Sequence, residues 1–164
     1  MIKDMAIPDK LLIDLLKESV NECYEKDYLL IEQSMEQASV ARIFYYMQTL
    51  INSDERFSCL RDYNLDCEYN KNGQHIKATP RCKNGTRPDM ILHKRGTNNH
   101  NLLVVEFKAE KGLRRTGNND LIKLEDFTSP YIYNYQLGVF VKLLKDKPGY
   151  CFFKNGNPPT PPET

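Results

Sequence analysis

The sequence predicts one mixed α/β (α+β) domain, in which helices flank a central sheet. The N-terminal third carries apolar side chains at helical spacing, and the middle of the chain carries short continuous apolar runs. A further helical stretch then separates these runs from two more strand-like segments. A chain of 164 residues buries a sufficient core by itself, and we expect one domain at residues 1–154 followed by a proline-rich tail at 155–164.

Two helices are predicted before the sheet. Pro8 stands where a first helix begins, and Leu12 and Leu16 share one face of it, so this segment is expected as an N-terminal helical extension. A second, longer helix is predicted from about residue 28 to 51, because its apolar residues recur at i, i+3, i+4 and i+7 around Ile43. One stripe of each helix should therefore face the core.

The rest of the chain is expected to build the sheet. The predicted elements are strands at 65–69, 89–93 and 102–108, a helix at 119–127, and strands at 131–144 and 150–153. A hairpin turn is predicted at residues 70–73, which read Asn-Lys-Asn-Gly. The second and third strands carry continuous apolar runs instead of alternating ones, which predicts that helices cover both faces of the sheet.

Positive charge is concentrated in one part of the chain, although the formal net charge is only +1. Residues 71–115 contain eleven Lys and Arg against three Asp and Glu, a net +8 that leaves −7 for the remainder. Lysine and arginine displace counterions from phosphates, so this basic segment predicts a nucleic-acid partner. A solvated basic face without a partner is the alternative.

Other classes of protein are disfavoured by the same sequence. The five cysteines are widely spaced and include no Cys-x-x-Cys pair, which argues against a disulfide framework and against a structural zinc site. No apolar run approaches the length of a membrane helix, and the acidic N-terminus lacks the form of a signal peptide. We therefore expect a cytoplasmic protein without a membrane partner.

An acid and a lysine stand side by side on the predicted strand at 102–108. Glu106 and Lys108 are two residues apart, so both point to one face of the sheet while Phe107 points to the other. Asp89 begins the preceding strand, and a hairpin between the two strands would bring its carboxylate next to Glu106. Adjacent carboxylates repel each other, and a hard divalent cation such as Mg²⁺ relieves that repulsion. With a lysine nearby, this set predicts metal-assisted phosphodiester hydrolysis.

A third carboxylate is expected from the long helix. Glu36 lies in its apolar stripe, and a carboxylate on a buried helix face is costly unless it is paired or bound to a metal. Glu32, one turn earlier, is the competing choice, and a solvated helix carboxylate is the alternative for both. For Glu106 and Lys108 the corresponding alternative is an exposed ion pair at a strand end, and for Asp89 it is a turn residue after proline.

These residues resemble the motif of the PD-(D/E)XK nuclease superfamily, which includes restriction endonucleases and Holliday-junction resolvases. Pro88-Asp89, followed after a gap by Glu106-Phe107-Lys108 at the end of an apolar strand, is similar to that pattern. The resemblance implies a restriction-endonuclease-like αβββαβ core over most of residues 35–144. Residues 68–70, 87–96 and 101–108 also look like a group of small stand-alone bacterial or phage members.

The leading hypothesis is therefore a Mg²⁺- or Mn²⁺-dependent nuclease, with DNA favoured as its substrate. Asp89 and Glu106 would hold the metal with help from the main-chain carbonyl of Val105 or Phe107. Glu36 would be an outer carboxylate, and Lys108 would orient the attacking water or stabilise charge on the phosphate. Contacts to nucleic acid are expected from Arg87, Lys111, Arg114, Arg115 and Lys123.

Two other hypotheses belong to different classes. A catalytically silent nucleic-acid- or protein-binding module on the same fold would keep the pocket without cleavage. A protein-interaction domain that uses its acidic helical half would need no metal site. The sequence leaves open whether the substrate is DNA or RNA, and whether the chain acts as a homodimer or within a larger complex.

Overall fold

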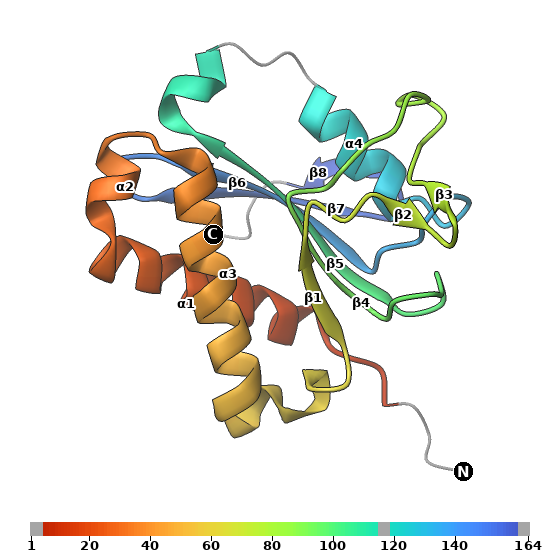
Figure 1. The fold of residues 1–164 in the computed structure, drawn as a ribbon, viewed down its shortest axis with the longest axis horizontal. Coiled ribbons are helices and arrows are strands. Elements are labelled where there is room, and N and C mark those ends of the chain that lie inside the picture. Colours follow the sequence, from red (N-terminus) through yellow and green to blue (C-terminus); the bar gives the residue numbers. More distant parts are fainter. Residues whose placement is uncertain (1–4, 115–118, 161–164) are drawn as a thin grey trace.

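A mixed six-stranded sheet forms the centre of the computed structural model, which describes residues 5–114 and 119–160 (Figure 1). Its strands lie in the order β1-β4-β5-β6-β7-β8. Their bounds are β1 Asn64–Cys67, β4 Met90–His93, β5 Asn101–Ala109, β6 Leu137–Leu143, β7 Pro148–Lys154 and β8 Asn157–Thr160. Neighbouring strands are antiparallel except β5 and β6, which are parallel. The predicted mixed α/β class is confirmed.

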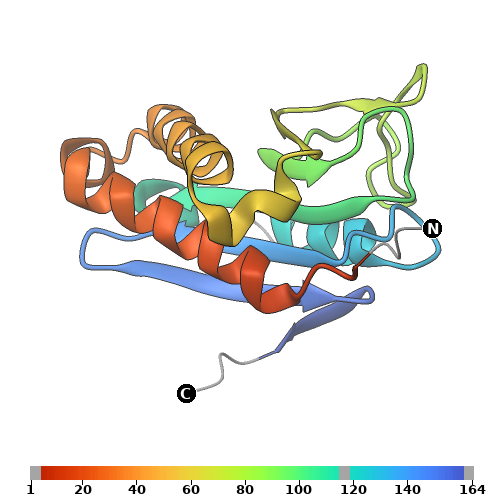
Figure 2. The ribbon, with the colours of Figure 1, turned by 90° about the horizontal axis from the view of Figure 1, so that it is seen from below.

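Helices cover both faces of this sheet, as the continuous apolar strands predicted (Figures 1 and 2). The helices are α1 Asp9–Lys26, α2 Tyr28–Glu32, α3 Glu36–Ser53 and α4 Asn119–Thr128, with 3₁₀ turns η1 Glu55–Leu60 and η2 Glu110–Arg114. Phe107 of β5 is buried in the core that α1 and α3 share, whereas Val104 is buried in the core on the α4 side. Among the described residues, no helix is long and apolar enough to cross a membrane.

The first predicted helix is confirmed, and the second is divided into two. Helix α1 begins directly after Pro8, as predicted. The expected long helix breaks after α2, because Ser34 adopts the left-handed conformation with φ +53°. The N–H groups of Ser34 and Met35 donate to the carbonyls of Ile31 and Leu30, which is the Schellman arrangement that closes a helix. A serine takes the position that glycine usually occupies, so the sequence carries no obvious stop signal.

The hairpin between β4 and β5 is confirmed, but the turn predicted at residues 70–73 belongs to a smaller structure. Strands β4 and β5 are antiparallel, with Met90 opposite Val105. Strands β2 Lys71–Asn72 and β3 His75–Ile76 form a separate two-stranded hairpin that turns at Gly73, whose φ is +62°. This small hairpin lies outside the main sheet, in the chain segment between β1 and β4.

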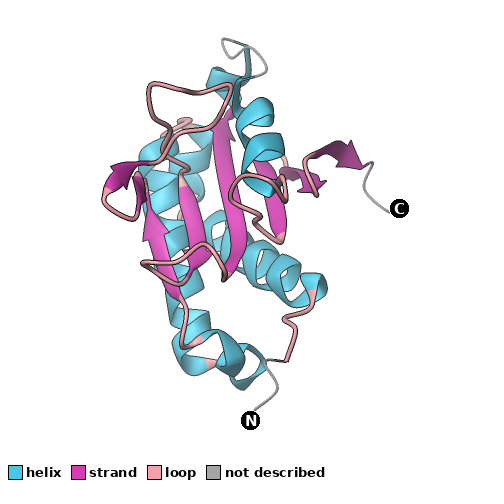
Figure 3. Cartoon of the chain, turned by 90° about the vertical axis from the view of Figure 1, so that its right-hand side faces the viewer, coloured by secondary structure: helices cyan, strands magenta, loops and turns pink. Residues whose placement is uncertain are grey.

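Two predictions about the C-terminal part were wrong in extent. The strand expected at 131–144 contains only β6, because residues 129–135 form turns in which Asn134 has a φ of +51°. The tail expected at 155–164 contains a strand, since β8 pairs with β7 at the edge of the sheet (Figure 3). Its two prolines are compatible with an edge strand, where one row of hydrogen bonds is not needed.

Helix α4 lies close to the sheet because β6 has a glycine beneath it. A Cβ atom added to Gly138 would lie 2.8 Å from Thr128 Cγ2 and 3.3 Å from Phe153 Cβ. Helix α4 connects β5 to the parallel strand β6, and Gly138 allows the last turn of the helix to approach the sheet closely.

We expect Gly138→Ala to destabilise the protein by about 1–3 kcal/mol, because the added methyl group overpacks the contact between α4 and β6. Urea unfolding measures this effect. Gly149→Ala in β7 is the matched control, since its Cβ would meet Lys142 side-chain atoms no closer than 3.5 Å. Equal stability of Gly138→Ala and the wild type would contradict the close contact.

Candidate functional site

The site lies where β5 extends beyond its neighbour β4. Pairing with β4 ends at Val105, so the last residues of β5 have no strand on that side. Two carboxylates take the place of the missing strand: Asp89 Oδ2 accepts a hydrogen bond from the Phe107 N–H at 2.7 Å, and Glu36 Oε2 accepts one from the Ala109 N–H at 2.8 Å. The fold thereby brings Glu36, Asp89 and the acidic strand end together.

Asp89 and Glu106 form the interior of the site. Glu106 is only 2% exposed, and the two carboxyl groups are hydrogen-bonded to each other. Burial raises the pKa of Glu106 well above its ordinary value, and the neighbouring Asp89 raises it further. Burial also raises the pKa of Asp89, against the opposing effect of the Phe107 N–H. Burial and the contact between the two carboxyl groups therefore favour a proton shared within this pair.

Lys108 points to the same side of the sheet as Glu106, as predicted from their spacing. Its Nζ lies 3.4 Å from Asp120 Oδ2 and 3.6 Å from Glu36 Oε1, and its side chain is 17% exposed. Burial acts against the ammonium charge, but Asp120 and Glu36 outweigh it and raise the pKa of Lys108. Gly112 of η2 leaves room for this side chain, since an added Cβ would lie 2.7 Å from Lys108 Cδ. Lys108 is thus a fixed cation.

Helix α4 completes the site with a second lysine and a carboxylate that was not predicted. Lys123 Nζ lies 3.1 Å from Asp120 Oδ1 and 4.0 Å from Glu106 Oε1. Burial lowers the pKa of Lys123, but Glu106 and Asp120 more than compensate and raise it. Asp120 therefore bridges Lys108 and Lys123. Its spacing of three residues from Lys123 is a common helical ion pair, and the contact with Lys108 becomes visible only once α4 is packed on the sheet.

Of the two competing helical carboxylates, the structure brings Glu36 to the end of β5 and leaves Glu32 away from it. Glu36 is the first residue of α3 and shares a face with the buried Ser39 and Ile43, but it lies at the half-exposed start of that stripe. Its side chain is 33% exposed and turns toward the end of β5. Glu32 is exposed at the end of α2.

The basic residues predicted to contact nucleic acid occupy different kinds of position. Arg87 and Lys111 are exposed, and Arg87 Nη1 is 4.0 Å from Glu68 Oε2. Lys123 contacts the carboxylates of the site instead of pointing to solvent. Arg114 ends η2, and Arg115 lies outside the described residues. Of these residues, Arg87 and Lys111 are thus the two whose side chains the structure shows to be exposed.

The donor set for a metal consists of two carboxyl groups. Among the residues that the structure describes, no group of three or more His, Cys, Asp or Glu is arranged to hold an ion. However, Glu106 Oε1 is buried and has no hydrogen-bond partner in the described part of the chain. Mg²⁺ is commonly held by one or two carboxylates and keeps several waters, so Asp89 and Glu106 fit such an ion.

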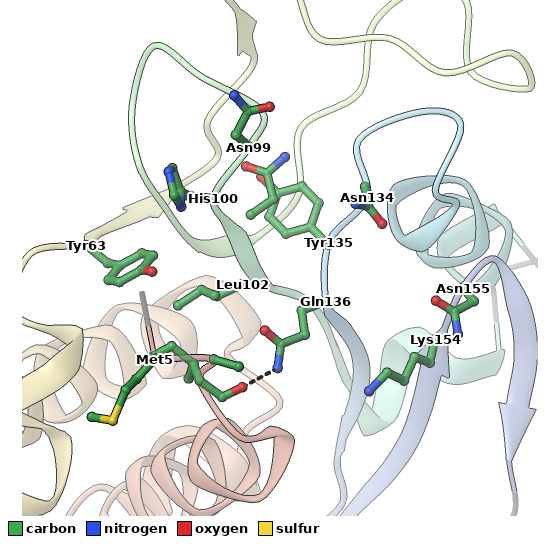
Figure 4. A pocket seen from close by; sticks show the side chains of 13 residues that line it. Met5, Tyr63, Asn99, His100, Leu102, Asn134, Tyr135, Gln136, Lys154 and Asn155 are labelled. Atoms are coloured by element: carbon green, nitrogen blue, oxygen red, sulfur yellow. Dashed lines mark hydrogen bonds between the residues drawn. The ribbon is translucent and has the colours of Figure 1, made fainter. Parts of the chain in front are cut away.

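Two cavities of the described structure lie away from these carboxylates. One of about 370 Å³ is open and polar, and it lies at the start of β5, where Asn99, Gln136 and Lys154 line it (Figure 4). Gln136 Nε2 donates to the Ile7 carbonyl at 2.7 Å and so joins the N-terminal segment to the sheet. A second cavity, of about 330 Å³, borders the β2–β3 hairpin. Neither cavity is lined by a residue predicted from the nuclease motif.

Glu106→Gln should change how stability depends on pH. The folded state holds a proton on Glu106 that the unfolded chain releases above the ordinary pKa of 4.5. The free energy of unfolding of the wild type should therefore fall as pH rises from that value through the raised pKa, whereas the glutamine variant lacks this loss. Urea unfolding in EDTA from about pH 5 to 8 tests this, with Glu32→Gln as the control. A difference between Glu106→Gln and wild type that does not change with pH would contradict it.

Comparison of the chain with protein-family models and with curated proteins finds no match. Support for a function therefore comes from the geometry of the site.

Proposed function

We propose that this protein is a metal-dependent nuclease that hydrolyses phosphodiester bonds at the end of β5. The observation that carries the proposal is the contact between the buried carboxyl groups of Asp89 and Glu106, beside the fixed ammonium group of Lys108. A site for phosphodiester hydrolysis needs a divalent cation and a positive charge near the phosphate, and this set supplies the ligands for one and the lysine for the other.

The charge balance supports a divalent cation at this position. Four carboxyl groups (Glu36, Asp89, Glu106 and Asp120) surround two ammonium groups (Lys108 and Lys123). In the absence of a cation, the excess negative charge is reduced by a proton on Glu106, and Glu106 Oε1 is left without a hydrogen-bond partner among the described residues. Asp89 and Glu106 would hold Mg²⁺ or Mn²⁺, with the Phe107 carbonyl as the proposed third protein ligand. The ion would polarise the phosphate and lower the pKa of a bound water.

The remaining residues act through position and charge. Lys108, held cationic by Asp120 and Glu36, would donate hydrogen bonds to a phosphate oxygen or to the attacking water. Glu36 fixes the end of β5 through the Ala109 N–H and orients Lys108 with its other oxygen. Lys123 limits the repulsion around Glu106. Arg87 and Lys111 would contact flanking phosphates, with DNA the favoured substrate.

The order of elements also supports the proposal. Helix α3, strands β1, β4 and β5, helix α4 and strand β6 follow one another in the order that the PD-(D/E)XK resemblance implies. The small hairpin β2–β3, helix α1 and strands β7 and β8 are additional elements. Because one fold can host many activities, the residues at the end of β5 are stronger support for the proposal than the topology.

Cleavage should require both the cation and the motif residues. With single-stranded, double-stranded and branched DNA and RNA as substrates, we expect cleavage in Mg²⁺ or Mn²⁺ and none in EDTA. Glu106→Gln and Lys108→Met should each lower kcat by about 10²-fold or more, as loss of a charge-stabilising group does in other enzymes. Lys10→Met, an exposed lysine on α1, should retain full activity.

Other outcomes of this assay contradict the proposal. Cleavage that persists in both variants would place the activity elsewhere or in a contaminant. A wild type that binds Mn²⁺ and nucleic acid without cleaving any substrate would favour the catalytically silent binding module.

Glu36 and Glu32 offer a matched pair of substitutions one helical turn apart. We expect Glu36→Gln to lower kcat about tenfold or more with little change in KM, because it loosens Lys108 and the strand end without removing an accessible phosphate contact. Glu32→Gln should behave as wild type. Steady-state cleavage kinetics measure both, and equal effects of the two substitutions would exclude a specific role for Glu36.

A further inference from the structure

Lys77 is a buried lysine on the α4 side of the sheet, outside the proposed catalytic site. Its side chain is 1% exposed, and its Nζ lies 4.6 Å from the ring centre of Tyr133 and 5.8 Å from that of Phe127. The rings of Tyr69 and Tyr135 also lie within 6 Å, and the ammonium group donates one hydrogen bond, of 3.2 Å, to the Tyr135 hydroxyl. Four aromatic rings therefore lie close to this amine.

No carboxylate of the described chain compensates this charge. The ion pairs between described residues do not include Lys77, whereas Lys108 and Lys123 each have carboxylate neighbours. Burial lowers the pKa of Lys77 to about 8. A buried ammonium group without a counter-ion is expensive, and cation–π contacts offset only part of that cost.

Lys77 is also one of the residues that line the cavity of about 330 Å³ next to the β2–β3 hairpin. The lining includes the cationic side chain of Lys71, the imidazoles of His75 and His93, and the amides of Asn72 and Asn98, and it contains no Asp or Glu. Asn98 Nδ2 donates to Asn72 Oδ1 at 2.9 Å, which ties the hairpin to the loop after β4. The cavity is therefore a polar, positively charged space with a fixed rim.

We propose that this cavity binds a phosphate group, with Lys77 as its buried counter-charge. The two lysines, Lys71 and Lys77, match the charge of a phosphate monoester better than the single charge of a carboxylate, whereas the His93 imidazole is already hydrogen-bonded to Asp66. The volume exceeds the need of a bare phosphate and is within the range of small-ligand pockets, so a nucleoside can accompany it. The ligand is a nucleotide phosphate, supplied either by a free nucleotide or by the phosphorylated end of a nucleic-acid strand.

Calorimetric titration in EDTA tests the proposal independently of cleavage. The probes are inorganic phosphate, AMP, adenosine, and a short single-stranded DNA with or without a 5′-phosphate. We expect the wild type to bind AMP, and to bind adenosine at least about tenfold more weakly, because adenosine lacks the charged contact. Preference for the 5′-phosphorylated DNA over AMP would identify the strand end as the source, and the reverse would identify the free nucleotide.

Lys77→Met keeps the shape of the side chain and removes its charge. We expect this variant to melt at a higher temperature than the wild type and to lose AMP binding at least tenfold. Lys71→Met, at the rim of the cavity, should weaken AMP several-fold, and Lys83→Met, an exposed lysine of the same segment, should have no effect.

Unchanged AMP binding by Lys77→Met, or the absence of AMP and phosphate binding by wild type at millimolar concentration, would overturn the proposal. If Lys77→Met does not fold, wild-type affinity in Lys71→Met overturns it equally. These results do not depend on a metal or on Glu106, so the phosphate site and the nuclease can fail separately.

Discussion

The unpaired end of β5 is the constraint on which the candidate site depends. Beyond Val105 the strand has lost its partner β4, and its amides at Phe107 and Ala109 would be buried without hydrogen bonds, at a cost of about 1–3 kcal/mol each. Asp89 and Glu36 satisfy these amides with one carboxylate oxygen each. The acidic cluster therefore also provides hydrogen-bond acceptors for two buried backbone amides. Because these acceptors are carboxylates, negative charge accumulates at the strand end.

The negative charge at the end of β5 explains how the neighbouring carboxyl and ammonium groups are arranged. Glu106 is driven toward its neutral form by burial and by Asp89, and the two lysines are driven toward their charged forms by Asp120 and its neighbours. Carboxyl groups still outnumber ammonium groups, and the dehydrated surroundings strengthen the imbalance. A divalent cation between Asp89 and Glu106 would release the shared proton and satisfy the buried oxygen of Glu106.

Local rules predicted some of these features, and others depended on packing. Glu106 and Lys108 share a face because side chains alternate along any strand, and Asp89 reaches them because β4 and β5 form a hairpin. The break at Ser34 could not be predicted, since a serine in the left-handed conformation is fixed by hydrogen bonds that form only in the folded chain. The role of Asp120 depends on the packing of α4 against the sheet, which no spacing in the sequence encodes.

The Lys77 side chain and the end of β5 both contact α4, but their surroundings have opposite electrostatic character. Lys123 joins the first turns of α4 to the carboxylates, while Phe127, one turn later, packs against the uncompensated ammonium of Lys77. Without a cation the carboxylate cluster repels a phosphate, whereas the Lys77 cavity attracts one at any metal concentration. The residues that mark the two places, Asp89 just before β4 and His93 at its end, are four positions or about 13 Å apart. A phosphorylated strand held at Lys77 would therefore be retained on the α4 side of the sheet before a metal completes the catalytic site. Binding of the strand would then not require the metal, whereas cleavage would.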